Sequence, residues 1–149
     1  EYACAVLFDE KKRPREITPN NSADGVKILL TPRFSIPVYI FIKDTEEISA
    51  GIQEISVQPR QGGTTINVTL QNTGNVHIRP MGTVLILNLE GEIVKNIPMG
   101  KSLPVFPGYK ETIPVMCPNL PAGSYSAVAT IEISKDKIVQ KKTAFHTQP

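Results

Sequence analysis

The stretch TTINVTLQN, residues 64–72, decides the fold class because its apolar and polar residues alternate without a slip. Ile66, Val68 and Leu70 fall on one face of a strand with this period of two, while threonine and asparagine fall on the other. Turn-forming residues border the stretch, as QGG before it and as NTGN at its end. The pattern predicts a β-strand with one buried face.

Short segments of the same kind continue along the chain, and none has the period of a helix. They are rich in Val, Ile and Thr, and many of the thirteen prolines and ten glycines of the chain separate them. About seven or eight such strands in about a hundred residues predict an antiparallel β-sandwich. One slip in phase is visible between Ile52 and Ile55. The predicted strands cover residues 51–58, 64–72, 83–89, 93–97, 111–117, 125–133 and 138–145.

Proline and tyrosine add detail to this prediction. Proline cannot donate a ladder hydrogen bond, so edge or connecting strands are expected around Pro98, Pro104, Pro107 and Pro114. In the penultimate strand, Tyr125 shares a face with Ala127, Ala129 and Ile131. Its place at the start of that strand fits either a tyrosine corner or a half-buried core tyrosine.

Composition and charge exclude several classes of protein. Sixteen basic residues against fourteen acidic ones leave a net charge of +2, and they are scattered, so no nucleic-acid surface is predicted. No run reaches the ~18 apolar residues of a membrane helix, since Arg33 and Pro37 interrupt the best candidate. The chain opens on Glu1 without a leader, so we expect a processed protein, periplasmic or otherwise exported, whose signal is not in this chain.

The first 45 residues are predicted to form a β-hairpin with a long loop. One arm is EYACAVLFDE, in which alternate apolar residues share a side: Tyr2, Cys4, Val6 and Phe8. A charged, proline-containing loop follows, KKRPREITPNNSAD, and GVKILLTPRFSIPVYIFIKD, residues 25–44, is the second arm. Because two strands are marginally stable alone, the hairpin is expected to need partner strands.

This order of elements resembles that of the periplasmic pilus-assembly chaperones. The resemblance rests on a strand ending in acid (YACAVLFDE), a basic loop, an alternating strand with an internal base (VKILLTPRFSIPVYI) and a second sandwich. That family has two immunoglobulin-like domains, and the last strand of the first domain lends apolar side chains to a pilin subunit that lacks its own final strand. The resemblance implies an incomplete first immunoglobulin-like domain over residues 1–45 and a second immunoglobulin-like sandwich over residues 46–149.

The resemblance also implies a partner-binding site. Val26, Ile28 and Leu30 fall on the alternating donor positions, and Arg33 falls where the family has a cleft base that anchors the terminal carboxylate of a subunit. Main-chain ladder bonds and a guanidinium that binds carboxylate with two hydrogen bonds suit these roles. The expected function is to bind a secreted, pilin-like subunit by strand complementation through the strand around residues 25–42.

Two features depart from the family, and simpler interpretations stay open. The second cleft base of the family lies on an early strand that this sequence lacks, and Pro32 and Pro37 interrupt ladder donation near Arg33. The three donor positions also fit plain core packing, and Arg33 also fits a solvated or paired surface base. The loop DEKKRPRE is either a solubilising linker or a mobile lid.

The cysteines and histidines indicate no metal, cofactor or catalytic site. Cys4 and Cys117 lie in different predicted domains, which favours two buried free thiols, with an interdomain disulfide as the alternative in an oxidising periplasm. Two Cys and two His without close spacing make no zinc ligand set. His77 and His146 have no nucleophile motif nearby, and QGGTT lacks the helix of a phosphate loop, so the chain is not expected to be an enzyme.

Two other classes of function remain open. A structural or adhesive immunoglobulin-like module of a cell-surface or secreted protein is the alternative to a chaperone. A carbohydrate-binding accessory domain is disfavoured, because the chain has no tryptophan and only 6% aromatic residues. The 25–42 strand discriminates the first two classes, since a chaperone accepts a foreign strand there and a spacer covers the strand itself. Self-association through the N-terminal hairpin is a further expectation.

Overall fold

The computed structural model describes residues 2–9, 15–17, 28–30, 32–100 and 102–147, and the side chains of all these except 15–17 and 28–30. The described residues form strands and connections without a helix, and every strand pairing is antiparallel. The chain separates into two compact units, Glu1–Ile42 (unit 1) and Lys43–Pro149 (unit 2), each described here by itself. The predicted all-β, antiparallel fold class is confirmed.

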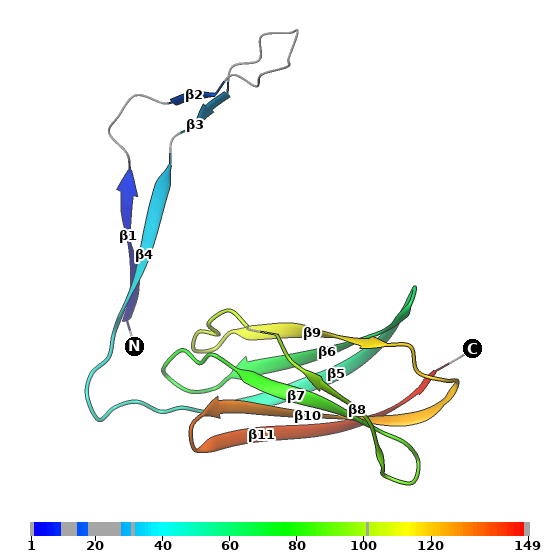
Figure 1. Cartoon of the computed structure of the whole chain (residues 1–149). Coiled ribbons are helices and arrows are strands. Elements are labelled where there is room, and N and C mark those ends of the chain that lie inside the picture. Colours follow the sequence, from blue (N-terminus) through cyan, green and yellow to red (C-terminus); the bar gives the residue numbers. More distant parts are fainter. Residues whose placement is uncertain (1, 10–14, 18–27, 31, 101, 148–149) are drawn as a thin grey trace, which may run out of the picture. The chain divides into compact units, whose positions relative to one another are not determined.

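Unit 2 is an antiparallel β-sandwich (Figure 1). Its three-stranded sheet has the order β5-β6-β9, and its four-stranded sheet has the order β11-β10-β7-β8. The strands are β5 (Ala50–Arg60), β6 (Gly63–Asn72), β7 (Met81–Leu87), β8 (Ile93–Pro98), β9 (Lys110–Pro118), β10 (Gly123–Ser134) and β11 (Lys137–Thr147). Each lies within a few residues of a strand predicted from the sequence.

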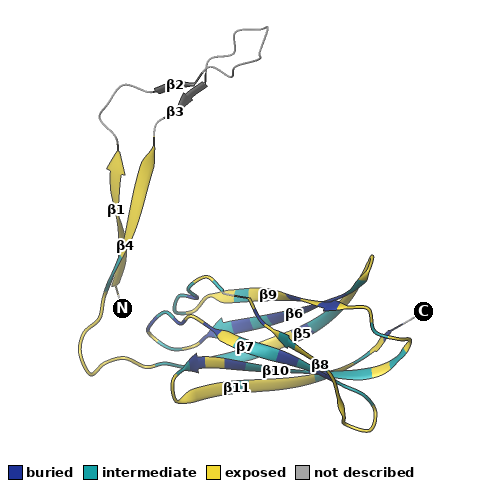
Figure 2. Ribbon diagram, in the orientation of Figure 1, coloured by how far each residue is buried: buried dark blue, intermediate teal, exposed yellow. Residues whose placement is uncertain are grey.

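The core of unit 2 lies between the two sheets (Figure 2). From β6 it takes Ile66, Val68 and Leu70, which are fully buried, as the strict alternation of that strand predicts. From the facing sheet it takes the fully buried side chains Val84, Ile86, Ala127, Ala129 and Ile131. Alanines at the centre of β10 leave room for the larger aliphatic residues opposite, so the two sheets pack closely.

Three finer sequence predictions are confirmed. The slip in phase of the first predicted strand is a register shift between Ile52 and Glu54 in the β5–β6 ladder, as a β-bulge produces. Tyr125 is a tyrosine corner, because its hydroxyl donates to the carbonyl oxygen of Pro121 over 3.1 Å. Pro98 and Pro114 lie on β8 and β9, which are edge strands of their sheets.

Asn72 is a fully buried polar side chain at the end of β6. Its amide nitrogen donates to the carbonyl oxygens of Val76 and Val105, both over 2.8 Å, and its Oδ1 accepts from the backbone N–H of Gly74 over 2.9 Å. One side chain therefore ties the end of β6 to the connection before β7 and to the connection before β9. The first residue of the NTGN stretch therefore has a structural role beyond the turn, because its hydrogen bonds hold together the connections at this end of the sandwich.

The connection that enters unit 2 is held by the other end of the NTGN stretch. Asn75 donates from Nδ2 to the carbonyl oxygen of Thr45 over 2.7 Å, and its Oδ1 accepts from the N–H of Glu47 over 2.7 Å. A Cβ on Gly74 would lie 2.1 Å from the Glu47 carbonyl oxygen, so only glycine permits this approach. Residues 45–47 are thus part of unit 2, and the preceding Asp44 has a positive φ of 63°.

Unit 1 contains two small antiparallel ladders. β1 (Tyr2–Asp9) pairs with β4 (Arg33–Ile40) from Tyr2↔Ile40 to Asp9↔Arg33 without a break in register. β2 (Arg15–Ile17) pairs with β3 (Ile28–Leu30). The predicted hairpin is present, and the predicted second arm consists of two strands, because Pro32 stands between β3 and β4 and cannot donate a ladder bond.

Replacing Asn72 with alanine should lower the free energy of unfolding by about 2 kcal/mol, because the Val76 carbonyl loses its hydrogen-bond donor in a dry environment. Urea unfolding followed by far-ultraviolet circular dichroism measures the change. Asn67→Ala is the matched control on the same strand, since Asn67 lies on the opposite, outward face. Equal stability losses for the two variants would show that the Asn72 hydrogen bonds contribute nothing specific.

Candidate functional site

The β1–β4 register gives the hairpin one continuous apolar face. Directly opposed residues of an antiparallel pair lie on the same face of the sheet. The pairs Tyr2↔Ile40, Cys4↔Val38, Val6↔Ile36 and Phe8↔Phe34 therefore share one face, which contains no polar or charged side chain other than the tyrosine hydroxyl and the thiol. We call these eight residues the hairpin face: Tyr2, Cys4, Val6, Phe8, Phe34, Ile36, Val38 and Ile40.

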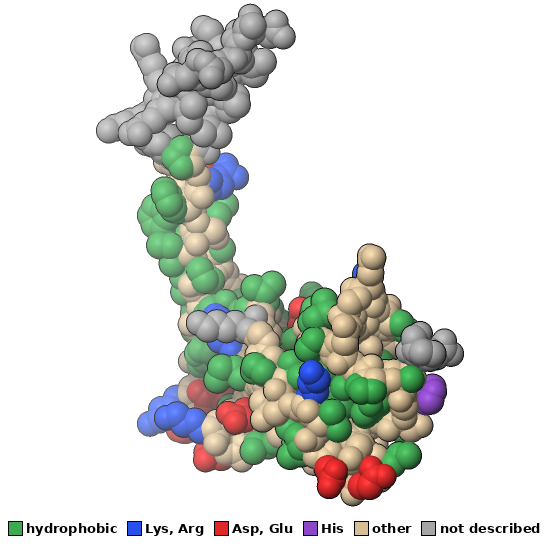
Figure 3. All heavy atoms as spheres, turned by 45° about the vertical axis from the view of Figure 1, so that its right-hand side comes forward, with side chains coloured by type: hydrophobic (Ala, Val, Ile, Leu, Met, Phe, Trp, Pro, Cys, Tyr) green, Lys and Arg blue, Asp and Glu red, His purple; other side chains and the backbone are tan. Residues whose placement is uncertain are grey.

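The hairpin face is exposed along almost its whole length (Figures 2 and 3). Phe34 is 66% exposed, Tyr2 68%, Phe8 52% and Ile36 52%, whereas Val38 is partly buried. In unit 2 the equivalent apolar faces are covered by a second sheet. No second sheet faces β1 and β4 among the described residues of unit 1. The hairpin face therefore has the apolar composition of a protein core, although most of its side chains are exposed to solvent.

The opposite face of the hairpin is mixed. It carries small, aromatic and charged residues in the pairs Ala3↔Tyr39, Ala5↔Pro37, Leu7↔Ser35 and Asp9↔Arg33. Pro37 lies in the middle of β4 and has no N–H, so β4 cannot offer an unbroken row of donors. The hairpin is thus two-sided, with a face suited to burial and a face suited to the surface.

Arg33, a predicted site residue, is paired with Asp9 at the end of the β1–β4 ladder where β1 ends and β4 begins. Its Nε donates to Oδ1 of Asp9 over 2.6 Å, and its Nη2 donates to Oδ2 over 3.2 Å, which is a bidentate arrangement. The side chains are 63% and 55% exposed, respectively. An exposed ion pair contributes about 0–1 kcal/mol, so another carboxylate would displace Asp9 at little cost.

The other predicted site residues are only partly described. Val26 lies outside the described residues. Ile28 and Leu30 lie on β3, opposite Ile17 and Arg15 of β2, and the structure does not describe their side chains. The structure brings Ile28 and Leu30 onto one short strand, and Arg33 begins the next strand along the chain.

Sequence analysis missed two features of this site. The sequence identifies Asp9 only as an acidic residue at the end of a strand. Its pairing with Arg33 becomes visible only when the register of β1 with β4 is known. The apolar residues of β4 were also not singled out, although Phe34, Ile36, Val38 and Ile40 alternate strictly. That alternation was the available signal, and it was obscured because the strand was interpreted together with the preceding apolar residues.

Both cysteines are free thiols, and one of them departs from expectation. Cys117 is fully buried on β9, and burial raises the pKa of its thiol, while the charge of Lys95 partly opposes this shift. Cys4 was expected to be buried as well, but it is exposed. The physical reason is that Cys4 belongs to the hairpin face, which no second layer covers in the described structure.

The histidines lie in ordinary strand and loop surroundings. The His77 ring lies 5.9 Å from the Phe106 ring, and His146 Nδ1 lies 3.2 Å from Oγ of its cross-strand neighbour Ser124. The structure gives His146 no hydrogen bond to a carboxylate among the described residues, and such a carboxylate orients the base in a catalytic triad. The Ser124–His146 contact is an exposed side-chain hydrogen bond between two paired strands.

The described residues contain no group of three or more His, Cys, Asp or Glu side chains that could hold a metal ion. The same part of the chain contains no helix with the length and apolar character needed to cross a bilayer.

Comparisons with known proteins add little. No protein-family model and no curated protein sequence matches the chain. A solved structure with a weak likeness is the selenomethionine-labelled β-glucosidase from Kluyveromyces marxianus, with a TM-score of 0.36 and 15% sequence identity. The likeness covers 68% of this chain, and the chain spans 14% of that enzyme. At this TM-score it carries no argument about fold or function.

The two thiols should react at very different rates. In the folded protein at pH 8, Ellman's reagent should titrate one thiol within minutes, because Cys4 is exposed while burial excludes the reagent from Cys117 and raises its pKa. In 6 M guanidinium chloride both thiols should react. Cys4→Ser should remove the fast phase and Cys117→Ser should leave it. A single slow phase in the folded wild type would show that Cys4 is covered in solution.

Proposed function

We propose that this chain belongs to a pilus-assembly-type chaperone that binds secreted subunits by strand complementation through the strand around residues 25–42. The observation that carries the proposal is a hairpin with a continuous apolar face, next to an exposed arginine at the start of β4. The immunoglobulin-like sandwich of unit 2 suits the same class. The proposal implies a periplasmic or otherwise exported protein with a secreted, pilin-like partner and no enzymatic activity.

The exposed hairpin face supports the proposal because it requires a cover. Full burial of a large apolar side chain stabilises by about 1.5–3 kcal/mol, and most side chains of this face are about half exposed. Covering the face is therefore worth on the order of 8 kcal/mol, comparable with the whole stability of a small domain. In our proposal the cover is the remainder of a first immunoglobulin-like domain.

The strand edges then provide the partner site. β1 and β4 pair only with each other among the described residues, so each has a second edge without a ladder partner there. On β4, Pro37 lacks the N–H of a donor row. Residues 20–31 contain no proline, so main-chain pairing with a subunit strand is expected along the β3 end of the arm. Val26, Ile28 and Leu30 would then fill successive pockets of the subunit.

Arg33 would hold the terminal carboxylate of the subunit. The bidentate geometry toward Asp9 shows that its guanidinium is oriented to take two carboxylate oxygens. Asp9 occupies that geometry in the described structure and would be replaced on binding. Because the pair is exposed, the exchange of one carboxylate for another is nearly neutral in energy, and the subunit's strand pairing decides the outcome.

A charge at a donor position should abolish partner binding. We expect Ile28→Asp to lose any stoichiometric partner when the complete protein is purified from the periplasm with the secreted proteins encoded beside it, because a carboxylate cannot enter an apolar pocket. Leu29→Asp is the matched control, since the neighbouring residue of a strand points to the opposite face. Circular dichroism checks folding. A wild type without a partner, or equal partner retention by both variants, would favour a structural or adhesive module.

Arg33 and Asp9 should act in opposite directions on the same complex. Arg33→Ala should weaken partner retention, while Asp9→Asn should maintain or strengthen it, because removing the competing carboxylate frees the guanidinium. Elution of the complex with increasing NaCl measures both effects. Arg79→Ala, which removes the same charge from unit 2, controls for net charge. Parallel losses in the Arg33 and Asp9 variants would show that the ion pair matters only for hairpin structure.

A further inference from the structure

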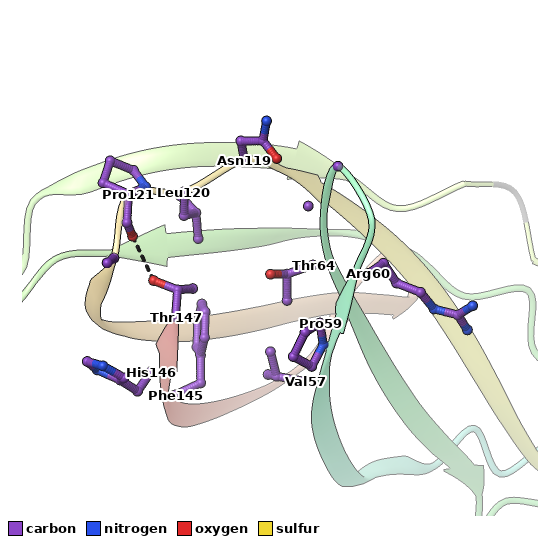
Figure 4. Close-up of a pocket in the computed structure, with 13 residues that line it drawn as sticks. Val57, Pro59, Arg60, Thr64, Asn119, Leu120, Pro121, Phe145, His146 and Thr147 are labelled. Atoms are coloured by element: carbon purple, nitrogen blue, oxygen red, sulfur yellow. Dashed lines mark hydrogen bonds between the residues drawn. The ribbon is translucent and has the colours of Figure 1, made fainter. Parts of the chain in front are cut away.

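One end of the unit 2 sandwich is hollowed (Figure 4). The hollow has a volume of about 950 Å³. It lies among the β5–β6 turn, the connection between β9 and β10, and the last residues of β11. A volume of this order is ample for a small organic ligand. All its residues belong to unit 2, so it is separate from the partner site proposed above.

The hollow exists because the two edge strands that border it are not hydrogen-bonded to each other there. β5 and β11 are edges of opposite sheets, and lysine side chains link them: Lys137 Nζ donates to the Ile48 carbonyl oxygen over 2.7 Å, and Lys141 Nζ donates to that of Gln53. Among the described residues, no side-chain hydrogen bond of this kind is found between the later residues of β5 and the end of β11. The adjoining turn contains Gly62, with a positive φ of 85°, so backbone without a side chain forms that wall.

Apolar and polar groups line the hollow in similar measure, and Asn119 and Thr147 are among the polar ones. Val57, Leu120 and Phe145 supply apolar surface, and the Phe145 ring is stacked on Tyr125 with centroids 5.8 Å apart, which fixes its orientation. Figure 4 shows the Thr64 hydroxyl directed into the hollow. Thr64 is only 9% exposed as a residue, but no described side-chain nitrogen or oxygen is both fully buried and without a hydrogen bond, so its hydroxyl is accessible from the hollow. A hydroxyl directed into the hollow can donate a hydrogen bond to a ligand that has a matching polar atom.

The charges of the residues at the rim indicate which charge the ligand carries. Arg60 and His146 border the hollow, and none of the residues that line it is acidic. His146 is engaged with Ser124, whereas Arg60 is exposed and has no carboxylate partner among the described residues. A ligand with an anionic group at the rim and an apolar group inside would complement both regions.

We propose that this hollow binds an N-acylated apolar amino acid, the chemistry of the C-terminal residue of a peptide. The apolar side chain lies on Val57, Leu120 and Phe145, the carboxylate pairs with Arg60 at the rim, and the amide carbonyl accepts from the Thr64 hydroxyl. This ligand satisfies the three features of the hollow together, which a fatty acid or an amine would not. The proposal does not depend on strand complementation by unit 1.

Three small probes test the proposal on the ¹⁵N-labelled full chain. N-acetyl-leucine should shift the amide resonances of Gly62, Thr64 and Phe145 in two-dimensional NMR spectra, with a dissociation constant of about 1 mM for so small a ligand. N-acetyl-leucinamide, which lacks the charge, and 4-methylpentanoate, which lacks the amide, should each bind at least fivefold more weakly. The ligand could be the C-terminus of a peptide or a free N-acyl amino acid. The tripeptide acetyl-Gly-Gly-Leu distinguishes them, since a site for peptide C-termini binds it and a site for the free acyl amino acid excludes it.

Paired variants assign the contacts. Arg60→Ala should weaken N-acetyl-leucine binding about tenfold and remove its preference over the amide, while Arg79→Ala should not. Thr64→Val should weaken binding about fivefold, whereas Thr65→Val, on the other face of β6, should leave it unchanged. The proposal is wrong if the three amide resonances do not move at 20 mM ligand, if the uncharged amide binds equally well, or if both arginine variants behave alike.

Discussion

A β-sheet with one apolar face is stable only when another layer covers that face, and this constraint separates the two units of the chain. In unit 2 the constraint is met, since Ile66 and Val68 of one sheet lie in the same core as Val84 and Ile131 of the other and all four are fully buried. In unit 1 it is not met among the described residues, because the hairpin face has no second sheet. The same sequence pattern therefore gives a closed core in one place and an exposed apolar face in the other.

The sequence was sufficient to predict most of unit 2, and the reason is local. Alternation fixes which residues of β6 and β10 face inward, and a change of phase near Ile52 identifies a bulge without any knowledge of the partner strand. The place of Tyr125 at the start of the penultimate strand suggested either a tyrosine corner or a half-buried core tyrosine, and its ring and its hydroxyl fit both. Each of these predictions depends on neighbours within one strand or one turn. Such patterns are preserved in the fold when tertiary contacts agree with them.

The candidate site was less predictable because it depends on pairings distant in sequence. That Asp9 meets Arg33 follows from the register of β1 with β4, and a shift of one residue would have reversed the faces. Cys4 is exposed because no second sheet covers β1 among the described residues. The alternation of apolar residues along one strand does not show whether another layer covers it. The hollow near Thr64 likewise forms where β5 and β11 cease to be linked, although these strands are far apart in the chain. The resemblance to pilus chaperones drew attention to residues 25–42, whereas the continuous apolar face became visible only from the β1–β4 register.

The two candidate surfaces differ in what they can recognise. The hairpin face offers a large apolar area and few polar atoms, which in our proposal the rest of a first domain covers. The strand edges beside it would discriminate between partners mainly by shape and by strand register. The hollow offers a charge at its rim and a hydroxyl directed inward, and such polar groups discriminate between ligands that pair with them and ligands that do not. A chain built this way would hold a folding partner broadly through unit 1, while unit 2 would select for one chemical feature, such as a C-terminal residue. That division of roles requires unit 2 to stay rigid, which the Asn72 and Asn75 hydrogen bonds at the opposite end of the sandwich support.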